Sequence, residues 1–436
     1  MGKHDWPPEN LRVDLVSSGK DADADAGKPA IKQQRMSEVR ILMYSHDTFG
    51  LGHLRRCRAI AHALVARFKG IHILIISGSQ IAGAFDFKAR VDFVKIPSVI
   101  KLYNGEYTSI GRHIDIQETL DWRRDIILAT ASSFDPDLFI VDKEPLGLKG
   151  ELLPTLAMLK NRGCQLVAGL RDVMDDVESL TEEWSKHDTL AQMDRYFDAI
   201  WVYGPTGFWN PVAGMQLPDG FEKRMTYTGF LRRETPSSKM SAIENLPPEY
   251  ILVTAGGGGD GHALMQATLA GHSINQDQQL PLLLVLGPFM RTRDREDIRA
   301  TAAKLPKVQV IDFHPQAEWL LQRAAGVVSM AGYNTFCEVL SLNKQTLLVP
   351  RTEPRKEQLI RARRAAELGL VDTLMPEQAA DPQVMSKQLL ELPGRPHPHD
   401  AGADRMLDGL DQICEEVRRY FESTNRGEVF LPPAAE

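Results

Sequence analysis

The chain has 436 residues, which is too long for one hydrophobic core and suits two domains of roughly 150–200 residues each. Its composition, with 43% hydrophobic and 25% charged residues, is that of a globular protein. The net charge of −7 disfavours a nucleic-acid partner, because contacts to phosphates need a basic surface.

The cysteines and the apolar segments indicate the cellular compartment in which the protein is expected. The four cysteines, Cys57, Cys164, Cys337 and Cys414, lack C-x-x-C spacing, which predicts free and mostly buried thiols rather than a zinc or redox site. The longest apolar segments, residues 71–77 and 281–287, are much shorter than the about 20 residues that a membrane-spanning helix needs. We therefore expect a cytoplasmic protein, for which only a peripheral contact at the inner membrane face remains open.

The first part of the chain alternates strand-like and helix-like segments after a polar leader. Residues 1–36 lack apolar periodicity, which predicts a disordered leader. Residues 39–44 form a short apolar run typical of a buried strand, and residues 53–68 carry apolar side chains at helical spacing. Further strand-like segments follow at residues 71–77, 92–97, 137–145, 164–172 and 199–204, with a polar-aromatic loop at residues 100–113. This pattern predicts a Rossmann-like domain with a parallel sheet over residues 37–234.

A segment rich in Pro and Ser at residues 235–248 predicts a linker. The alternation then restarts, which predicts a second Rossmann-like domain over residues 249–400 and a C-terminal helix and tail over residues 401–436. The expected fold class is α/β, with two tandem doubly wound Rossmann-like domains that face a cleft. Because ligands bind at the carboxyl ends of the strands in such sheets, we expect the site residues in the loops that follow strands.

The loop after the first strand carries the first candidate residues. Gly50 and Gly52 permit a tight turn, and the helix that follows offers an N-terminus that favours anions. His53, at the start of that helix, is a candidate general base or a ligand of a phosphate or hydroxyl; the alternative is that it only begins the helix. Asp47 is a weaker candidate for the base or for orienting His53. Arg55 lies two residues after His53 in the same predicted helix.

A glycine-rich loop also follows the first strand of the second domain. Gly257, Gly258 and Gly259 lie in a run of four glycines just before a predicted helix, an arrangement that exposes backbone N–H groups to a phosphate. The alternative is a flexible loop. The spacing matches neither the dinucleotide-binding G-x-G-x-x-G pattern nor a P-loop, so a dehydrogenase dependent on NAD fits poorly.

The segment AGYNTFCE, residues 331–338, combines a turn with a helix start. Gly332 makes the turn, and the backbone N–H groups of Tyr333, Asn334 and Thr335 are expected to point at an anion. About one turn further along, the carboxylate of Glu338 can accept hydrogen bonds from two vicinal hydroxyls, such as those of a ribose. The alternative for Glu338 is an ordinary solvated helix residue.

A third group of polar residues follows the next strand. Glu357 and Gln358 are hydrogen-bond acceptors placed for sugar hydroxyls. The nearby Arg361, Arg363 and Arg364 are expected on a solvated face of the following helix.

The order of these segments is similar to that in glycosyltransferases of the GT-B fold. The sequence resembles family 28 of these enzymes most closely over residues 225–373. The resemblance implies that the amides of residues 333–335 hold the diphosphate of a nucleotide-sugar donor and that Glu338 holds its ribose. It also implies that Arg233, in the segment TGFLRR, contacts the diphosphate.

The same resemblance sets the expected contacts on the sugar and on the acceptor. Glu357 and Gln358 stand where the family has paired glutamines that touch the donor sugar, so the identity of that sugar stays open. His53 corresponds to the histidine of the family's N-terminal glycine-rich motif, of which two glycines are replaced here. The resemblance implies that the domain over residues 37–234 binds the acceptor, with Gly50, Gly52 and Arg55 on the acceptor side.

The expected function is that of an inverting, metal-independent glycosyltransferase of the hexosyltransferase type. The resemblance implies direct displacement of the nucleotide diphosphate, and no D-x-D motif follows a strand to hold a metal, so neither a metal nor a cofactor is expected. A UDP-sugar is the favoured donor, and the acceptor is open between lipid-linked and polysaccharide precursors. Two alternatives remain: a nucleotide-sugar 2-epimerase or hydrolase of the same fold, and a non-catalytic protein that binds nucleotide sugars.

Overall fold

The computed structural model describes residues 34–46, 52–101, 107–109, 114–234, 243, 245–314 and 316–423. The predicted leader up to residue 33, most of the predicted linker and the tail beyond Ser423 lie outside these ranges, as do Asp47 and Gly50. The predicted domain boundaries therefore stay predictions. Within the described ranges, no helix is both long and apolar enough to cross a membrane.

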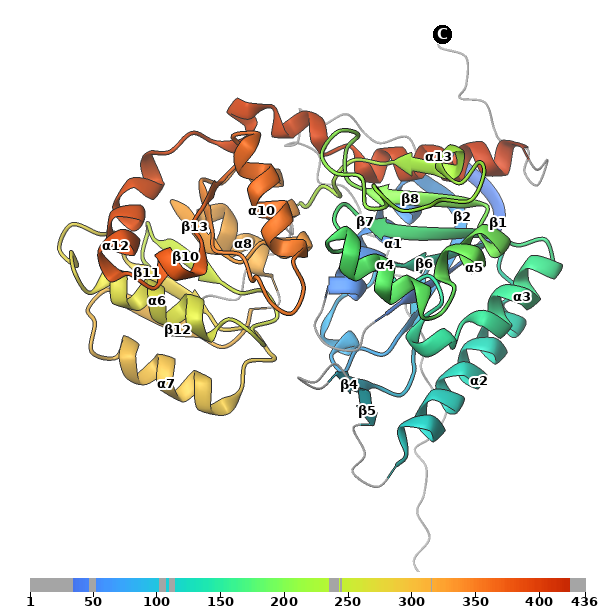
Figure 1. The fold of residues 1–436 in the computed structure, drawn as a ribbon, viewed down its shortest axis with the longest axis horizontal. Helices are drawn as coiled ribbons and strands as arrows, with labels where there is room; N and C mark the ends of the chain where they lie inside the picture. Colours follow the sequence, from blue (N-terminus) through green and yellow to red (C-terminus); the bar gives the residue numbers. More distant parts are fainter. Residues whose placement is uncertain are drawn as a thin grey trace, which may run out of the picture. The chain divides into compact units, whose positions relative to one another are not determined.

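The first part of the chain forms a seven-stranded sheet in which all neighbouring strands are parallel (Figure 1). Its strands, in spatial order, are β3 (Val91–Lys95), β2 (Phe68–Ser77), β1 (Gln34–Ser45), β6 (Leu138–Asp142), β7 (Gln165–Arg171), β8 (Ala199–Tyr203) and β9 (Met225–Tyr227). The helices between them are α1 (Gly52–Arg67), α2 (Ile116–Phe134), α3 (Leu153–Asn161), α4 (Val177–Ser185) and α5 (Thr189–Tyr196).

The second part of the chain forms a six-stranded sheet, which is also parallel throughout. Its strands, in spatial order, are β12 (Val308–Ile311), β11 (Leu282–Val285), β10 (Ile251–Thr254), β13 (Gly326–Ser329), β14 (Thr346–Leu348) and β15 (Asp372–Thr373). Its helices are α6 (His262–His272), α7 (Thr292–Ala302), α8 (Ala317–Arg323), α9 (Tyr333–Ser341), α10 (Glu357–Glu367), α11 (Pro376–Ala379) and α12 (Pro382–Glu391).

Both faces of the first sheet are covered by apolar side chains. Along β1, Ile41 and Met43 belong to one core cluster with residues of α1, whereas Leu42 and Tyr44 belong to another with residues of α2 and α3. Successive side chains of a strand point to opposite faces, so a central strand buried on both faces reads as a continuous apolar run. This explains why residues 39–44 showed no polar alternation in the sequence.

The last helix, α13 (Gly409–Ser423), packs against α1 and so returns to the first part of the chain. The turn before it lies against the segment after β9, where Phe230 N donates to Met406 O at 2.7 Å. A side chain at Gly409 would place its Cβ 2.5 Å from the carbonyl oxygen of Gly229, which is too close for any other residue. The close backbone approach of these two segments therefore requires a glycine.

The sequence-based expectation of a loop at residues 100–113 was wrong in part. β4 (Val99–Lys101) pairs with β5 (Tyr107–Ser109) in an antiparallel ladder, although residues 102–106 between them lie outside the described ranges. Each of these strands has only three residues, too few for an apolar alternation to stand out.

Candidate active site

The two sheets share the same strand order around their first strands, which gives each sheet one switch point. In each sheet the strand order reverses between the first strand and the fourth, so the switch points lie between β1 and β6 and between β10 and β13. In doubly wound sheets, ligands bind outside the carboxyl ends of the strands at such switch points. The predicted site residues His53 and Gly332 follow β1 and β13, and the glycine-rich loop follows β10.

At the first switch point, His53 forms a pair with Asp142. His53 lies in the first turn of α1, and Asp142 is the last residue of β6. The Nδ1 atom of His53 lies 2.6 Å from Oδ2 of Asp142. A carboxylate can only accept, so Nδ1 carries the hydrogen and Nε2 of the neutral ring keeps its lone pair. The pair is therefore arranged so that Nε2 can take a proton.

Arg56 holds the same carboxylate from the next turn of α1. Its Nε and Nη2 atoms donate to the two oxygens of Asp142 at 3.0 and 2.7 Å, and both side chains are buried. Burial by itself would raise the pKa of Asp142, but the charge of Arg56 and the hydrogen bond from His53 hold it well below its ordinary value. Asp142 thus stays ionised at neutral pH.

The protonation of His53 follows from its surroundings. Burial lowers its pKa from 6.5 to about 4, although the hydrogen bond and the charge of Asp142 act in the opposite direction. The ring is consequently neutral at pH 7, the state that a general base requires. Its side chain keeps 16% of its surface exposed, so a substrate hydroxyl has access to it.

At the second switch point, the glycine-rich loop depends on its glycines. Gly256 and Gly258 have φ values of +65° and +86°, in the left-handed region that favours glycine. A Cβ at Gly258 would lie 2.0 Å from the carbonyl oxygen of Leu286, so this position also requires a close backbone approach. The loop ends at Gly261, and α6 starts at the next residue. Gly257 and Gly259 lie in this turn as predicted by the sequence.

The helix α9 starts directly after β13, with Gly332 as its N-cap. Its first internal hydrogen bond runs from Phe336 N to Gly332 O, so the N–H groups of Tyr333, Asn334 and Thr335 precede the helical ladder. These three amides, together with the helix dipole, favour an anion at this end. Their binding of a diphosphate stays a prediction.

The side chain of Asn334 joins this helix end to the start of α1. Its Nδ2 atom donates to Gly52 O at 3.0 Å, and its Oδ1 atom accepts from Arg233 Nη2 at 2.8 Å. Arg233 also donates from Nη1 to the carbonyl oxygen of Arg55 at 3.3 Å. The structure thus brings two helix N-termini and the predicted diphosphate-binding arginine to one place.

Glu338 is buried, with 2% of its side chain exposed, so the alternative of a solvated residue is wrong. It forms an ion pair of 2.5 Å with Arg55, which also donates to Glu318 at 2.7 Å. Burial raises the pKa of Glu338 to about 7, because the charge of Glu318 adds to it and Arg55 offsets only part of the shift. Arg55, which the sequence placed on the acceptor side, therefore contacts the residue predicted to hold the donor ribose.

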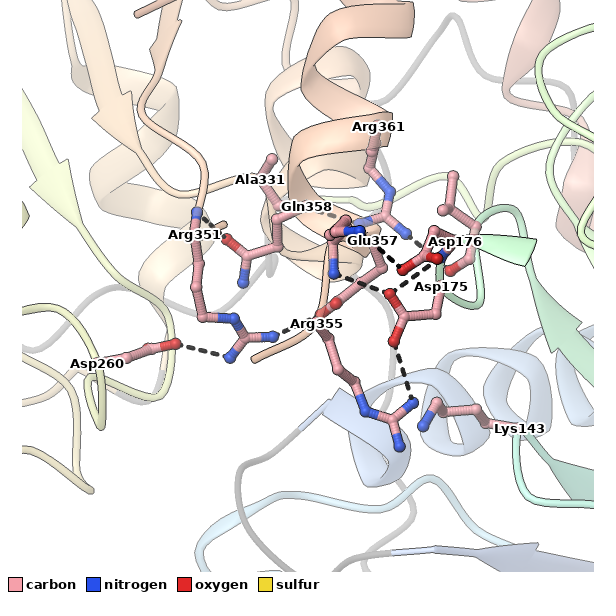
Figure 2. Close-up of polar contacts among 12 residues, drawn as sticks. Lys143, Asp175, Asp176, Asp260, Ala331, Arg351, Arg355, Glu357, Gln358 and Arg361 are labelled. Carbon is pink, nitrogen blue, oxygen red and sulfur yellow. Dashed lines mark hydrogen bonds and ion pairs between the residues drawn. The ribbon is translucent and has the colours of Figure 1, made fainter. Parts of the chain in front are cut away.

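The predicted sugar-binding residues lie at the start of α10, as Figure 2 shows. Glu357 accepts from Arg351 Nη2 at 2.6 Å, and Gln358 accepts from the backbone N–H of Arg351 at 3.2 Å. Arg351 in turn donates to Asp260, which lies in the glycine-rich loop, at 2.8 Å. Arg351 therefore links the loop after β14 to the loop after β10.

The expectation of a solvated face was wrong for Arg361. Its side chain has no exposed surface and donates to both oxygens of Asp172, at 2.6 and 2.7 Å. It also donates to Ala331 O at 2.8 Å (Figure 2). Asp172 directly follows β7 of the first sheet, whereas Arg361 lies on α10 of the second part. The pair thus connects the two parts of the chain next to the start of α9.

Asp142 and Asp172 are the residues that the sequence reading missed. Each stands at or just after the carboxyl end of a central strand. Because ligands bind at these strand ends, that position could have marked both residues as candidates. Among the described residues, no group of three His, Cys, Asp or Glu side chains is arranged to hold a metal ion.

Comparison with known proteins agrees with this geometry. Residues 250–404 match the glycosyltransferase family 28 C-terminal domain. No curated protein matches the chain by sequence. Among solved structures, the glycosyltransferase of kitacinnamycin has a TM-score of 0.60 at 15% identity, covering 89% of this chain and 99% of its own. MurG of Acinetobacter baumannii has a TM-score of 0.54 at 14% identity, with 87% and 99% covered.

A protein of Listeria monocytogenes assigned as a UDP-N-acetylglucosamine 2-epimerase has a TM-score of 0.59 at 14% identity, with 91% of this chain and 100% of that chain covered. At such identities, the likeness shows the fold alone. The two parallel sheets with their paired switch points therefore define a protein of the two-domain GT-B class.

Together with the family 28 domain, this class identifies the chain as a nucleotide-sugar glycosyltransferase that resembles family 28. Such an enzyme takes its sugar from a nucleotide-sugar donor and passes it to a carbohydrate or lipid acceptor.

Proposed function

We propose that the chain is an inverting glycosyltransferase in which His53, oriented by Asp142, removes the proton of the acceptor hydroxyl. The observation that carries this proposal is the 2.6 Å contact between His53 Nδ1 and Asp142 Oδ2 at the first switch point. It leaves Nε2 of a neutral ring as the proton acceptor. The deprotonating hydroxyl oxygen attacks the anomeric carbon of the donor sugar, and the bond to the nucleotide diphosphate breaks on the opposite face.

The leaving diphosphate would lie at the second switch point. The amides of Tyr333, Asn334 and Thr335, the glycine-rich loop and the guanidinium of Arg233 supply fixed dipoles and charge for the negative charge that develops there. Glu338 would accept from the ribose hydroxyls, and Glu357 and Gln358 from hydroxyls of the transferred sugar. Because these groups can stabilise the leaving group, the proposed reaction does not depend on a metal ion.

The nucleotide is tested by a thermal-shift screen with UDP-, GDP-, ADP- and dTDP-sugars, in which UDP-sugars are expected to raise the melting temperature most. A bound ligand stabilises the folded state according to its concentration over its dissociation constant. The screen is repeated with EDTA, and turnover with an acceptor extract is followed in parallel. Loss of turnover in EDTA would contradict metal independence, and the absence of any shift would contradict the proposed donor site.

Inversion is tested on the product. With an acceptor found in such an extract, nuclear magnetic resonance of the first product formed gives the anomeric configuration relative to the donor. We expect the opposite configuration. A product with the configuration of the donor would exclude direct displacement and leave the His53–Asp142 pair without its proposed role.

We propose a lipid-linked or polysaccharide precursor as the acceptor and a peripheral contact with the inner face of a cytoplasmic membrane. The four cysteines are all buried and none of them is assigned to a disulfide, which supports a reducing compartment such as the cytoplasm. Sedimentation with vesicles of anionic and of neutral lipid tests the membrane contact, and equal recovery in the supernatant with both would contradict it.

Epimerisation of the donor is a second candidate, because one structure of similar fold is assigned as a UDP-N-acetylglucosamine 2-epimerase. Incubation with the nucleotide sugar alone separates the candidates. A glycosyltransferase leaves the donor largely intact, whereas an epimerase or a hydrolase converts it without an acceptor.

A further inference from the structure

Arg171 differs from the other arginines around the site because it has no direct partner. It is the last residue of β7, at the carboxyl edge of the first sheet. Arg56, Arg351, Arg355 and Arg361 each form ion pairs with carboxylates within 4 Å. Among the described residues, the side chain of Arg171 has neither a hydrogen-bond partner nor an ion pair, and its buried Nε atom has no acceptor. A buried donor without an acceptor is costly, so this guanidinium has an unused capacity to bind.

Two more cations lie near this end of β7, since the backbone N–H of Lys143 donates to the carbonyl oxygen of Gly169, two residues before Arg171, at 2.6 Å. Lys143 directly follows Asp142, has a φ of +67° and is buried, with its Nζ atom 2.5 Å from Glu144. Arg355 donates to Glu183 at 2.9 Å and points toward Lys143 (Figure 2). Burial is the main reason that the pKa of Lys143 falls to about 8; Glu144 opposes this shift, and the charges of Arg355 and Arg171 add to it. An anion placed among these cations would relieve their mutual repulsion.

Glu357 lies one helical turn before Arg361 on α10, and the partner of Arg361, Asp172, directly follows Arg171. One of its oxygens accepts from Arg351, whereas the other, Oε2, is buried and has no hydrogen-bond partner among the described residues. Burial acts to raise the pKa of Glu357, but the charge of Arg171, followed by that of Arg351, lowers it below its ordinary value. Arg171 and Glu357 thus interact through space without an ion-pair contact. A ligand that contacts both side chains has to accept from Arg171 and donate a hydroxyl hydrogen to Glu357.

We propose that Arg171, assisted by Lys143, binds an anionic oxygen group of a substrate, a phosphate or a carboxylate, next to the sugar hydroxyls held by Glu357. This inference rests on the proposed function, since it names the chemistry of a substrate in the same site. The anionic group has two sources, the acceptor or the diphosphate of the donor. An acidic acceptor is the source that the position at the edge of the first sheet favours, because Arg171 follows β7 rather than a strand of the second sheet.

The test uses the full chain, inorganic phosphate as the probe and isothermal titration calorimetry. Phosphate is titrated into protein saturated with a nucleotide diphosphate, the one contained in the nucleotide sugar that gave the largest thermal shift. The donor diphosphate site is then already filled. The variants are Arg171→Gln, Arg171→Lys and, as the matched control, Arg162→Gln on the exposed end of α3. Melting temperatures without ligand show whether each variant folds. Arg171→Lys keeps the charge if Arg171→Gln does not fold.

If the anionic group belongs to the acceptor, phosphate should bind the wild-type protein that is already saturated with the nucleotide diphosphate. Arg171→Gln should then weaken the binding of phosphate by about tenfold or more, as expected for a lost charge-assisted hydrogen bond. Arg171→Lys retains part of the binding, and Arg162→Gln retains all of it. If Arg171→Gln instead weakens the nucleotide diphosphate by about tenfold, the donor is the source and the assignment of Arg171 still holds. Unchanged affinity of the variant for both ligands overturns the inference.

Failure of the proposed function gives a different result. If no nucleotide diphosphate binds the wild type, the donor site is wrong. Phosphate titrated into the free wild type and the free Arg171→Gln variant still decides whether Arg171 binds an anion.

Discussion

The two halves of the candidate site are built by different means. The half at the second switch point is made mainly of backbone: a loop with two glycines in the left-handed region and the first amides of α9. The half at the first switch point is made of paired side chains, with Asp142 held between His53 and Arg56. A backbone-built site is local in sequence, whereas His53 and Asp142 are 89 residues apart.

This difference has a consequence for what substitutions should do. In the second half, a single added methyl group fills space that a ligand needs. In the first half, the loss of one charge leaves another charge buried without a partner, which is expensive. Arg361 and Asp172 form a buried ion pair that joins the two halves. A substitution of either residue should therefore act as in the first half, by leaving a buried charge without a partner, although Arg361 lies in the second part of the chain.

The largest effect is expected from His53→Ala, which removes the proposed base from the side-chain half. The value of kcat should fall by about 10²–10⁴-fold, because general base catalysis contributes that much. The affinity for the nucleotide sugar, measured by thermal shift, should stay unchanged, since the donor contacts lie at the second switch point. The control is His72→Ala, which changes an exposed histidine on β2. Unchanged turnover in His53→Ala would remove His53 from the mechanism.

The next largest effect is expected on stability, from Asp172→Ala. It leaves the guanidinium of Arg361 buried without its carboxylate, and breaking a buried pair in this way costs about 3–5 kcal/mol. The matched control is Glu367→Ala, which breaks the exposed pair with Arg364 on the same helix and should cost about 1 kcal/mol or less. Urea unfolding followed by circular dichroism measures both. Similar midpoints for the two variants would show that the buried pair does not hold the two parts of the chain together.

The fold and the backbone-built half could be predicted from the sequence because their signals are contiguous. Apolar runs alternating with helical periodicity predicted both parallel sheets, and AGYNTFCE predicted a helix start at Tyr333, where α9 begins. The glycine run predicted a tight loop, and Gly256 and Gly258 do adopt left-handed backbone. In each of these cases the residue type reports a local backbone requirement.

The side-chain half could be predicted only in part. Arg361 looked like one of several arginines on a charged helix, and nothing near it in sequence indicates that its partner Asp172 lies 189 residues earlier. Asp142 stood at the end of an apolar run, which marks it as a candidate, but the choice of His53 and Arg56 as its partners depends on strand order. The role of Asp47 remains a prediction, as its position lies outside the described residues.

A smaller effect is expected from Gly332→Ala, which tests the backbone half. A Cβ at Gly332 meets no atom within 4 Å in the unliganded protein, so folding should change little. A diphosphate held against the amides of α9 would meet the methyl group, and such overpacking typically costs about 1–3 kcal/mol, here of binding. Gly394→Ala, where a Cβ also meets nothing within 4 Å, is the control. Equal nucleotide affinity in both variants would place the diphosphate away from the start of α9.

The smallest effect is expected on the pH dependence of donor binding, and it comes from Glu338. This residue belongs to the second half of the site but is held by an ion pair with Arg55. Its pKa is raised to about 7, mainly by burial, so its carboxylate becomes protonated as the pH falls through 7. A protonated carboxyl group accepts ribose hydroxyls less well, so the affinity for the nucleotide diphosphate should fall by about tenfold between pH 8 and pH 6.

In Glu338→Gln the affinity should be weaker at pH 8 and nearly independent of pH, whereas Glu391→Gln, an exposed change on α12, should follow the wild type. Calorimetric titration of the nucleotide diphosphate at pH 6, 7 and 8 measures the three proteins. If wild type and Glu338→Gln show the same pH profile, the carboxylate of Glu338 does not contact the ribose. The ion pair with Arg55 would then only fasten α1 to α9.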